Sequence, residues 1–419
     1  MPRAASLCVF CRCCLLAGLI TEASKAQAPL TLRDALDLAE KNNPALAAAA
    51  AVVSASEAGI TTARAYPNPF ASSQTGRQMV RVPGNVTGVV QILSFQQPLE
   101  LGSLRPSRIA LAEQSREVAE LQRQVRRIAV LSQVRRTFYE VLRRDAELAL
   151  LQENLALVES LRKRVAVQVE VGEAARLELV RADAEIASAR AQVNAARIRR
   201  VSALAAFRAA VGAPLEGEIS LSGEPEPVAI LPALDKISAD ALQDHPILRL
   251  ARSERIRAQS RISFEKSLRL PQPTLRTDYE RYPDVPNFRF GIDIPIPLWN
   301  RREGPIAEAQ AAFREAAANE ELRRIELMAA LEGAYRRLEE AEEQIRAYER
   351  GVLPQAEAAL KAAQTAFQLG ERGILEVLDA QRLLRSARVE LLNARFDRQA
   401  ALVDLDEFRG VDPTGIYRK

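Results

Sequence analysis

Apolar residues recur along two long stretches of the chain at the spacing of a coiled coil. In the first stretch most intervals are three or four residues, and the stripe consists of Val118, Leu121, Val125, Ile128, Val134, Phe138, Val141, Leu148, Leu151, Leu155 and Val158. This period predicts a helix with one buried face. The two stretches run from Leu104 to Val171 and from Arg302 to Leu369. Each span corresponds to about 100 Å of helix.

A second pattern, with a period of two, predicts strands. In "FRFGIDIPIPLW" the positions from Phe288 to Leu298 alternate so that only one face is apolar. The segments 274–282 and 86–95 alternate less regularly, and "FASSQTGRQMV" does so only weakly. The pattern alone fits a membrane strand and the edge of a soluble sandwich equally well.

The order of these elements repeats after about 200 residues. Four pairs of segments mark the repeat: "NNPAL" and "DHPIL", "YPNPF" and "LPQPT", "QQPLE" and "PIPLW", and "VGEAARLELVRAD" and "LGERGILEVLDAQ". Each half is therefore predicted to contain one helix, two strands, a long helix, a turn and a returning helix. The expected division is a signal peptide at 1–26, a first repeat at 27–212, a Pro- and Gly-rich linker at 213–236, a second repeat at 237–410 and a tail at 411–419.

The helix that opens each half is expected to follow a capping residue, Thr31 or Ser238, and to end at a Pro-x-Pro pair. The opening helices are predicted from Leu32 to about Arg64 and from Ile237 to about Leu268, and the returning helices from Ala174 to about Val211 and from Ile374 to about Phe408. A returning helix reaches only about 55 Å, which leaves about 45 to 50 Å of each long helix without a partner. Because the opening helix has this length, we expect it to stack end-on with the returning helix.

The first residues predict export. Arg3 precedes a short apolar segment, Cys13 to Ile20, and small residues follow, which indicates a signal peptide cleaved after Ala26. The alternative is that the chain starts as a soluble cytoplasmic protein. All four cysteines lie before the expected cleavage site, so the mature chain would offer neither disulfides nor thiolates.

Composition argues against several classes of function. The 58 basic and 54 acidic residues nearly balance, and no dense basic block suggests nucleic-acid binding. A single histidine, His245, leaves little material for a metal centre or a catalytic triad, and no nucleotide-binding motif occurs. We therefore expect neither an enzyme nor a cofactor.

The mature sequence contains no long uninterrupted apolar run, so no transmembrane helix is expected. A membrane would then have to be crossed by strands. Four strands cannot close a barrel, since membrane barrels need about eight or more, whereas three copies would supply twelve. Alanine-rich helix faces such as "AEAQAAFREAAANEE" would let the helices of neighbouring copies approach closely.

The duplicated order and several motifs resemble the TolC-type outer-membrane efflux proteins. "LTLRDALDLAEKNNPAL" resembles the start of that family, "LGERGILEVLDAQ" its hairpin turn and "IPIPLWNRREGPIAEAQ" its second strand-to-helix junction. "QQPLELGSLR" and "NRREGPIAEA" are most similar to the branch that serves heavy-metal (cobalt-zinc-cadmium) resistance.

The resemblance implies a mainly α fold with a small β part. In such a homotrimer, the long helical hairpins form an α-barrel, continuous with a shared twelve-stranded β-barrel in the outer membrane. It also implies two partners, a periplasmic adaptor and an inner-membrane RND-type pump. The chain would conduct the pump's cargo passively, with metal cations as the first expectation.

The same resemblance places function at the hairpin tips. It implies that Arg372, Glu376 and Asp379 help to close a periplasmic aperture, and three copies of the two acids around one axis would attract cations. In the first repeat Glu178 matches Glu376, but Arg181 stands where Asp379 does. The alternative is that an acid in the first turn of a helix only complements the helix dipole.

Three further residues complete the expected sites. Gly172 and Gly370 are expected to form the two hairpin turns. Trp299, at the end of the most regular strand, is expected to anchor the membrane interface or to pack at the base of the barrel.

Other functions stay open on the sequence alone. Within the same class, the chain could be the duct of a multidrug efflux or type I secretion system. In a different class, it could be a periplasmic coiled-coil scaffold or adaptor. An adaptor would usually have one hairpin, a lipoyl-like domain and an inner-membrane anchor, so two hairpins and four strands favour the duct.

Overall fold

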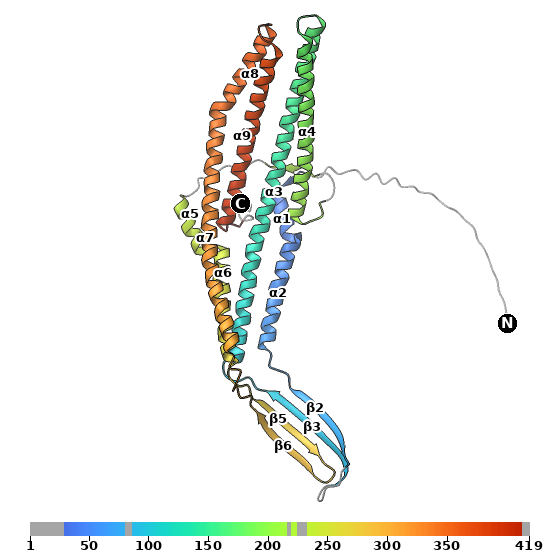
Figure 1. The fold of residues 1–419 in the computed structure, drawn as a ribbon, viewed down its shortest axis with the longest axis vertical. Helices are drawn as coiled ribbons and strands as arrows, with labels where there is room; N and C mark the ends of the chain where they lie inside the picture. The colour runs from blue at the N-terminus through green and yellow to red at the C-terminus, as the bar shows by residue number, and fades with distance from the viewer. Residues whose placement is uncertain (1–28, 80–85, 216–218, 224–232, 413–419) are drawn as a thin grey trace, which may run out of the picture.

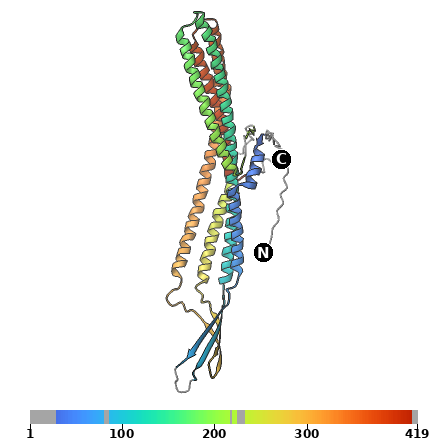
Figure 2. The same ribbon diagram turned by 90° about the vertical axis from the view of Figure 1, so that its right-hand side faces the viewer.

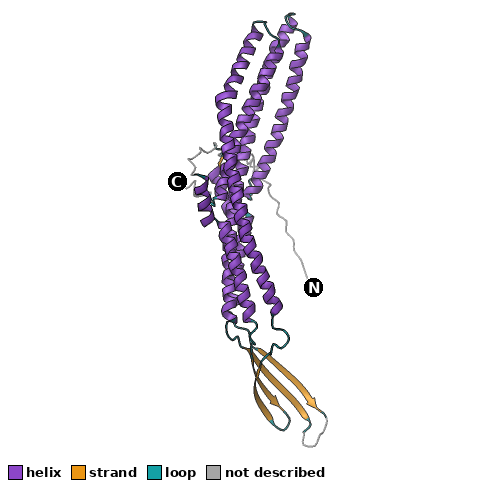
Figure 3. Cartoon of the chain, turned by 60° about the vertical axis from the view of Figure 1, so that its left-hand side comes forward, coloured by secondary structure: helices purple, strands orange, loops and turns teal. Residues whose placement is uncertain are grey.

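The computed structural model describes residues 29–79, 86–215, 219–223 and 233–412. The molecule is long and narrow, and its helices run from a tip to a small sheet at the opposite end (Figures 1 and 2). Figure 3 shows the sheet separated from the helical tip by the whole length of the helical region. The expected signal peptide at 1–26 and most of the tail at 411–419 lie outside the described residues.

Each half opens with two helices, where the sequence analysis expected one. The four helices are α1 (Leu32–Asn42), α2 (Pro44–Arg64), α5 (Leu234–Asp244) and α6 (Pro246–Ser267). They break at Asn43 and His245, whose ψ angles are 121° and 129°. The single-helix prediction was wrong because Pro44 and Pro246 lack a backbone N–H and favour an extended conformation in the preceding residue.

Of the two predicted helix caps, one is present and the other is not. Thr31 caps α1, because its Oγ1 accepts a hydrogen bond from the N–H of Asp34 (3.3 Å) and the Asp34 carboxylate accepts one from the Thr31 N–H (3.3 Å). Ser238 was a wrong assignment, since it lies inside α5. The residue before that helix is Ala233, which has no side-chain acceptor.

The two long helices differ in one feature. In the first repeat, α3 (Leu104–Glu170) is a single helix of 67 residues, as predicted. Its counterpart comprises α7 (Glu303–Ala347), a π-helix η1 (Tyr348–Val352) and α8 (Leu353–Gln368). Pro354 lies in the first turn of α8 and cannot donate a backbone hydrogen bond to the preceding turn, which accounts for a local change of helix type.

The returning helices confirm the expected stacking. They are α4 (Arg176–Val211) and α9 (Ile374–Phe408). Along α3, α4 is followed end to end by α2, and along α7, α9 is followed by α6 (Figure 1). The residue at each break contacts the last turn of the returning helix. Asn43 Nδ2 donates to the carbonyl of Ala210 in α4 (2.8 Å), and His245 Nε2 lies 3.1 Å from the carbonyl oxygen of Glu407 in α9.

The strands form one antiparallel sheet in the order β2-β3-β5-β6. Their bounds are β2 (Phe70–Gln78), β3 (Gly88–Pro98), β5 (Thr274–Arg281) and β6 (Pro286–Asp293). The last strand is shorter than its alternation predicted, because Pro295 and Pro297 cannot donate ladder hydrogen bonds. Within the described residues, β2 and β6 each pair on one side only, so the sheet has two open edges.

The two faces of this sheet differ in chemistry. Large exposed apolar residues share one face: Val89, Leu93, Phe95, Leu275, Tyr279, Phe288, Phe290 and Ile292. The other face carries ion pairs, Arg276 with Asp278 (2.8 Å) and Arg289 with Glu280 (2.9 Å). Such a division fits a sheet with lipid on one side and water on the other.

A short parallel pair ties the linker to the start of the chain. It consists of β1 (Leu30–Thr31) and β4 (Leu221–Ser222).

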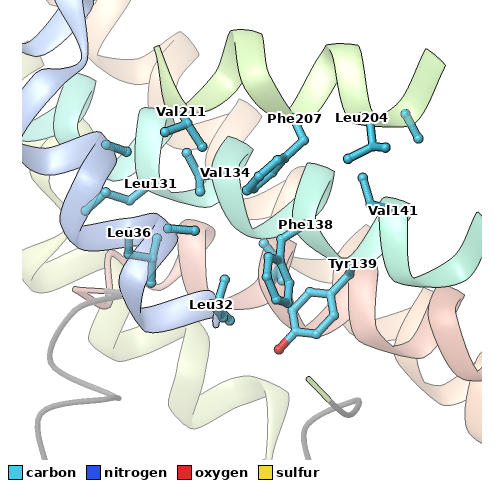
Figure 4. Close-up of a cluster of buried hydrophobic side chains, with 14 of the residues drawn as sticks. Leu32, Leu36, Leu131, Val134, Phe138, Tyr139, Val141, Leu204, Phe207 and Val211 are labelled. Atoms are coloured by element: carbon cyan, nitrogen blue, oxygen red, sulfur yellow. The ribbon is translucent and has the colours of Figure 1, made fainter. Parts of the chain in front are cut away.

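Half-way along the molecule, the largest hydrophobic cluster joins α1, α3, α4 and α9 (Figure 4). Phe138 of α3 lies fully buried at its centre, with its ring centroid 6.0 Å from that of Phe207. Because Val403 of α9 belongs to the same cluster, this core connects both repeats.

Among the described helices, α2 alone is long and apolar enough to cross a membrane by length and composition. No such helix was predicted from the sequence. α2 meets the criterion because alanine dominates it and Glu57 and Arg64 are its only charged residues. The helix packs along α3, where Arg108 donates to the carbonyl of Ala63 (2.9 Å). Most of its alanine face is uncovered in the single chain.

Candidate functional site at the helical tip

The two hairpin turns at the tip have matching backbones. Gly172 and Gly370 have φ angles of 80° and 72°, in the left-handed region that favours glycine. The next residue donates to a carbonyl five positions earlier in both turns: Glu173 to Gln168 (2.8 Å) and Glu371 to Ala366 (3.0 Å). These bonds end the long helices in the same way and direct each returning helix back along its partner.

Two carboxylates from different hairpins lie beside the second turn. Glu178 and Glu376 each occupy the first turn of a returning helix. A Cβ placed on Gly373 would lie 3.1 Å from Glu178 Oε1 and 3.9 Å from Glu376 Oε2. Arg372 Nη1 lies 3.7 Å from Glu376 Oε1, in a pair that is largely exposed. Glu178, Glu376 and Arg372 therefore lie close together at the second turn.

A buried carboxylate links the hairpins just below the turns. Glu185 of α4 accepts a hydrogen bond from Arg382 Nη2 of α9 at 2.6 Å, and its other oxygen lies 3.5 Å from Arg385. The Glu185 side chain is only 7% exposed. Arg382 also lies 3.4 Å from Asp379, and its hydrogen bond with Glu185 raises the pKa of the Arg382 guanidinium. Asp379 thus contacts a network that ties the second hairpin to the first.

A hydrophobic cluster above this network packs the same two hairpins together. Its buried members are Leu161, Val165, Ala182, Phe367, Ile374, Val377 and Leu378. They come from α3, α4, α8 and α9, so apolar contact joins the two hairpins next to the ion pairs.

Glu185, Arg382 and Arg385 were not predicted from the sequence. A signal was present, because Glu185 directly precedes buried Ile186 and follows buried Ala182 by three residues. A charged residue on the apolar face of a helix needs a partner in the fold. That partner could not be identified from the sequence, since it lies 197 residues away.

The other expected site residues are not part of this network. Arg181 is exposed on α4. Trp299 was expected to end a strand, but β6 stops at Asp293. Trp299 instead lies in the connection to α7 and is 94% exposed. His245 caps α6. No cluster of three or more His, Cys, Asp or Glu side chains that could hold a metal ion occurs in the part of the chain that the structure describes.

Duplicated hairpins about 100 Å long, attached to an open sheet with one apolar face, define a class of proteins that line a passage from a membrane into an aqueous space. The family model of the outer membrane efflux proteins matches residues 35–213 and 237–411, and the chain belongs to this family. The predictions of family, fold class and location in the outer membrane with extension into the periplasm are thereby confirmed.

Two relatives and one solved structure illustrate the similarity. The chain is 28% identical over 402 residues to the cobalt-zinc-cadmium resistance protein CzcC of Cupriavidus metallidurans, which covers 92% of this chain and 91% of that protein. It is 26% identical over 293 residues to the nickel-cobalt-cadmium resistance protein NccC of Alcaligenes xylosoxydans xylosoxydans, covering 70% and 66%. The crystal structure of CusC matches with a TM-score of 0.78 at 19% identity, covering 91% of this chain and 92% of that chain.

Proposed function

We propose that three copies of this chain form the passive outer-membrane duct of a tripartite efflux system. The observation that carries this proposal is the four-stranded sheet with open edges at β2 and β6. An open edge in lipid leaves backbone groups without hydrogen-bond partners. If β2 of one copy pairs with β6 of the next, three copies close a ring of twelve strands.

The helical region supports the same ring. In Figure 1, α2 and α7 lie on opposite flanks of the molecule. Both helices have alanine-rich exposed faces, including the segment "AEAQAAFREAAANEE" of α7. Small side chains let helix backbones approach closely, so α2 of one copy can pack against α7 of its neighbour. The hairpins of three copies then enclose a tube that continues the strand ring.

The tip has features of a contact site for another protein. Exposed apolar side chains surround both turns, namely Val171, Leu177, Val180, Leu369 and Leu375, which are 44 to 68% exposed. Such a group at the end of a water-surrounded hairpin fits protein–protein contact. The proposed partners are a periplasmic adaptor and, through it, an inner-membrane RND-type pump. The pump supplies the energy, and the duct needs neither a catalytic residue nor a cofactor.

Metal cations are the proposed cargo. Both curated relatives are named for resistance to divalent metals, cobalt and cadmium among them. Within the two tip segments, 171–181 and 369–379, five acids outnumber three bases, and three copies would multiply this excess around the entrance. The acids are Glu173, Glu178, Glu371, Glu376 and Asp379, and the bases are Arg176, Arg181 and Arg372. An acidic entrance concentrates cations.

Deletion and complementation of the gene in its own host test the function. Sensitivity to cobalt, zinc or cadmium, reversed by the wild-type gene, is the expected result. Sensitivity to organic drugs alone would assign the duct to multidrug efflux, and loss of a secreted protein to type I secretion. Recovery of the protein in the inner-membrane or soluble fraction would contradict the duct and favour a scaffold.

A further inference from the structure

His245, the only histidine in the chain, lies where the end of α9 meets the start of α6. We call this contact between stacked helix ends a helix joint. Its Nδ1 accepts a hydrogen bond from the Ile247 N–H (3.1 Å), and its Nε2 lies 3.1 Å from the Glu407 carbonyl oxygen. A backbone N–H can only donate and a carbonyl can only accept. The ring must therefore be neutral, with its proton on Nε2.

The first repeat builds the same joint with an amide. Asn43 Oδ1 accepts from the Ala45 N–H (2.9 Å), and Asn43 Nδ2 donates to the Ala210 carbonyl (2.8 Å). The two residues thus perform identical roles, each capping the next helix and bonding the end of the previous one. Only one of them can gain a proton near neutral pH, because an amide does not titrate.

The histidine joint is closely packed on one side. Gly410, with φ 69°, ends α9 so near the ring that a Cβ there would lie 2.8 Å from Pro246 Cδ and 3.2 Å from His245 Cδ2. On another side lies a cavity of about 180 Å³, lined mainly by apolar residues that include Val125, Ile128 and Leu327. His245 as a whole residue is only 8% exposed. A charge on it would have little contact with bulk water.

We propose that His245 makes the second helix joint of each copy sensitive to acid, while the matching joint at Asn43 is insensitive. A proton on Nδ1 removes the acceptor of the Ile247 N–H and sets two donors against each other. It also places a positive charge at the N-terminus of α6, where the helix dipole disfavours it. Acid therefore loosens the connection between the tip-bearing helix α9 and the helix that leads to the sheet.

The direction of the pH dependence follows from the environment of the ring. Burial lowers the pKa of His245, and its hydrogen bond with the Glu407 carbonyl offsets part of this effect. The unfolded chain has the ordinary value of about 6.5. Stability from the neutral ring is thus present above about pH 6.5 and is lost as the pH falls through the lower folded value.

The acids of α9 nearest the ring are already engaged in ion pairs. On α9, Glu407 is paired with Arg136 and Asp406 with Arg135, both of α3. Beyond the end of α9, Asp412 pairs with Arg127 of α3 (3.0 Å), and Asp244 of α5, which directly precedes the ring, is exposed to solvent. Arg323 and Glu326, which line the cavity, pair with each other (2.8 Å).

Because the chain has one histidine, its ring can be observed directly. The full-length protein, purified with a histidine-free tag and labelled with ¹⁵N-histidine, should show one tautomer with the proton on Nε2 at neutral pH. Hydrogen exchange of the Ile247 amide should then lose about tenfold of its protection between pH 7 and pH 5 in wild type, relative to His245→Asn at the same pH. A proton on Nδ1 at neutral pH, or equal profiles in the two proteins, would overturn the proposal.

A reciprocal variant tests the proposal independently if His245→Asn does not fold. Asn43→His introduces an ionisable ring into the first joint, and the Ala45 amide should acquire the same loss of protection in acid. If the Ala45 amide in that variant exchanges as in wild type across the pH range, a histidine at such a joint is not an acid sensor and the proposal fails.

Discussion

Glu185 of α4 and Arg382 of α9 lie 2.6 Å apart, and the carboxylate is almost completely buried between the two hairpins. Replacing Glu185 by Gln would keep the volume but leave Arg382 and Arg385 without their shared acid. An exposed pair contributes up to about 1 kcal/mol and a broken buried pair costs about 3–5 kcal/mol, so we expect a loss of roughly 2 kcal/mol for this half-exposed network.

The functional readout of Glu185→Gln is conductance in a planar bilayer, which should rise because the hairpins separate more readily at the tip. Glu173→Gln is the matched control, since Glu173 is exposed in the first turn. Equal conductance and equal melting temperature for Glu185→Gln and wild type would show that the bridge does not hold the hairpins together.

Charge at the tip is expected to set ion preference. Joint replacement of Glu376 by Gln and Asp379 by Asn removes two acids per copy from the entrance. A unit charge acts through water with on the order of 1 kcal/mol at close range, so the cation-over-anion permeability ratio should drop by about fivefold. The reversal potential in a salt gradient measures this ratio.

The first turn offers the opposite change. Arg181 stands where the second turn has Asp379, and it is exposed. Arg181→Asp should therefore raise the cation preference that the previous variant lowers. A reversal potential that responds to neither variant would place the selective region elsewhere in the duct.

Alanine substitutions at two glycines should have opposite effects on stability. Gly410→Ala should destabilise the protein by about 2 kcal/mol or more, because alanine disfavours the left-handed conformation by about 1–2 kcal/mol and its Cβ would meet Pro246. Gly59→Ala, in the open middle of α2, should instead stabilise by about 0.5–1 kcal/mol. Chemical denaturation measures both, and equal shifts would contradict the close packing at the joint.

The apolar face of the sheet should face lipid. Phe290 of β6 is 73% exposed and belongs to that face. Phe290→Arg should cost about 2–4 kcal/mol near the bilayer midplane and reduce the amount of assembled protein in the outer membrane. Gly291→Arg places the same charge on the opposite face, where no atom lies within 4 Å of a new Cβ, and should assemble normally. The reverse ranking would invert the two faces.

The long helices and the turns were predictable because they depend on local patterns. The apolar stripe from Val118 to Val158 lies inside α3 (Leu104–Glu170), and a glycine followed by a new helix marks each turn. The breaks at Asn43 and His245 were also encoded, in the prolines of "NNPAL" and "DHPIL". They were missed because the apolar pattern continues across them.

The strands and the tip network show what the sequence could not provide. β2 has almost no alternation, and it is a strand because nine of its residues pair with β3. Alternation alone extended β6 too far, since the pattern does not reveal which N–H groups are missing. Glu185 and Arg382 become neighbours only when two hairpins pack together, a relationship of distant segments that no local signal contains.

The central claim is that three chains complete one duct, and the mass of the native assembly tests it most directly. Native mass spectrometry of the mature protein, extracted from outer membranes in mild detergent, should show a particle of three chains. A stable monomer would contradict the account, because its four strands would then have to rest in lipid with both edges open.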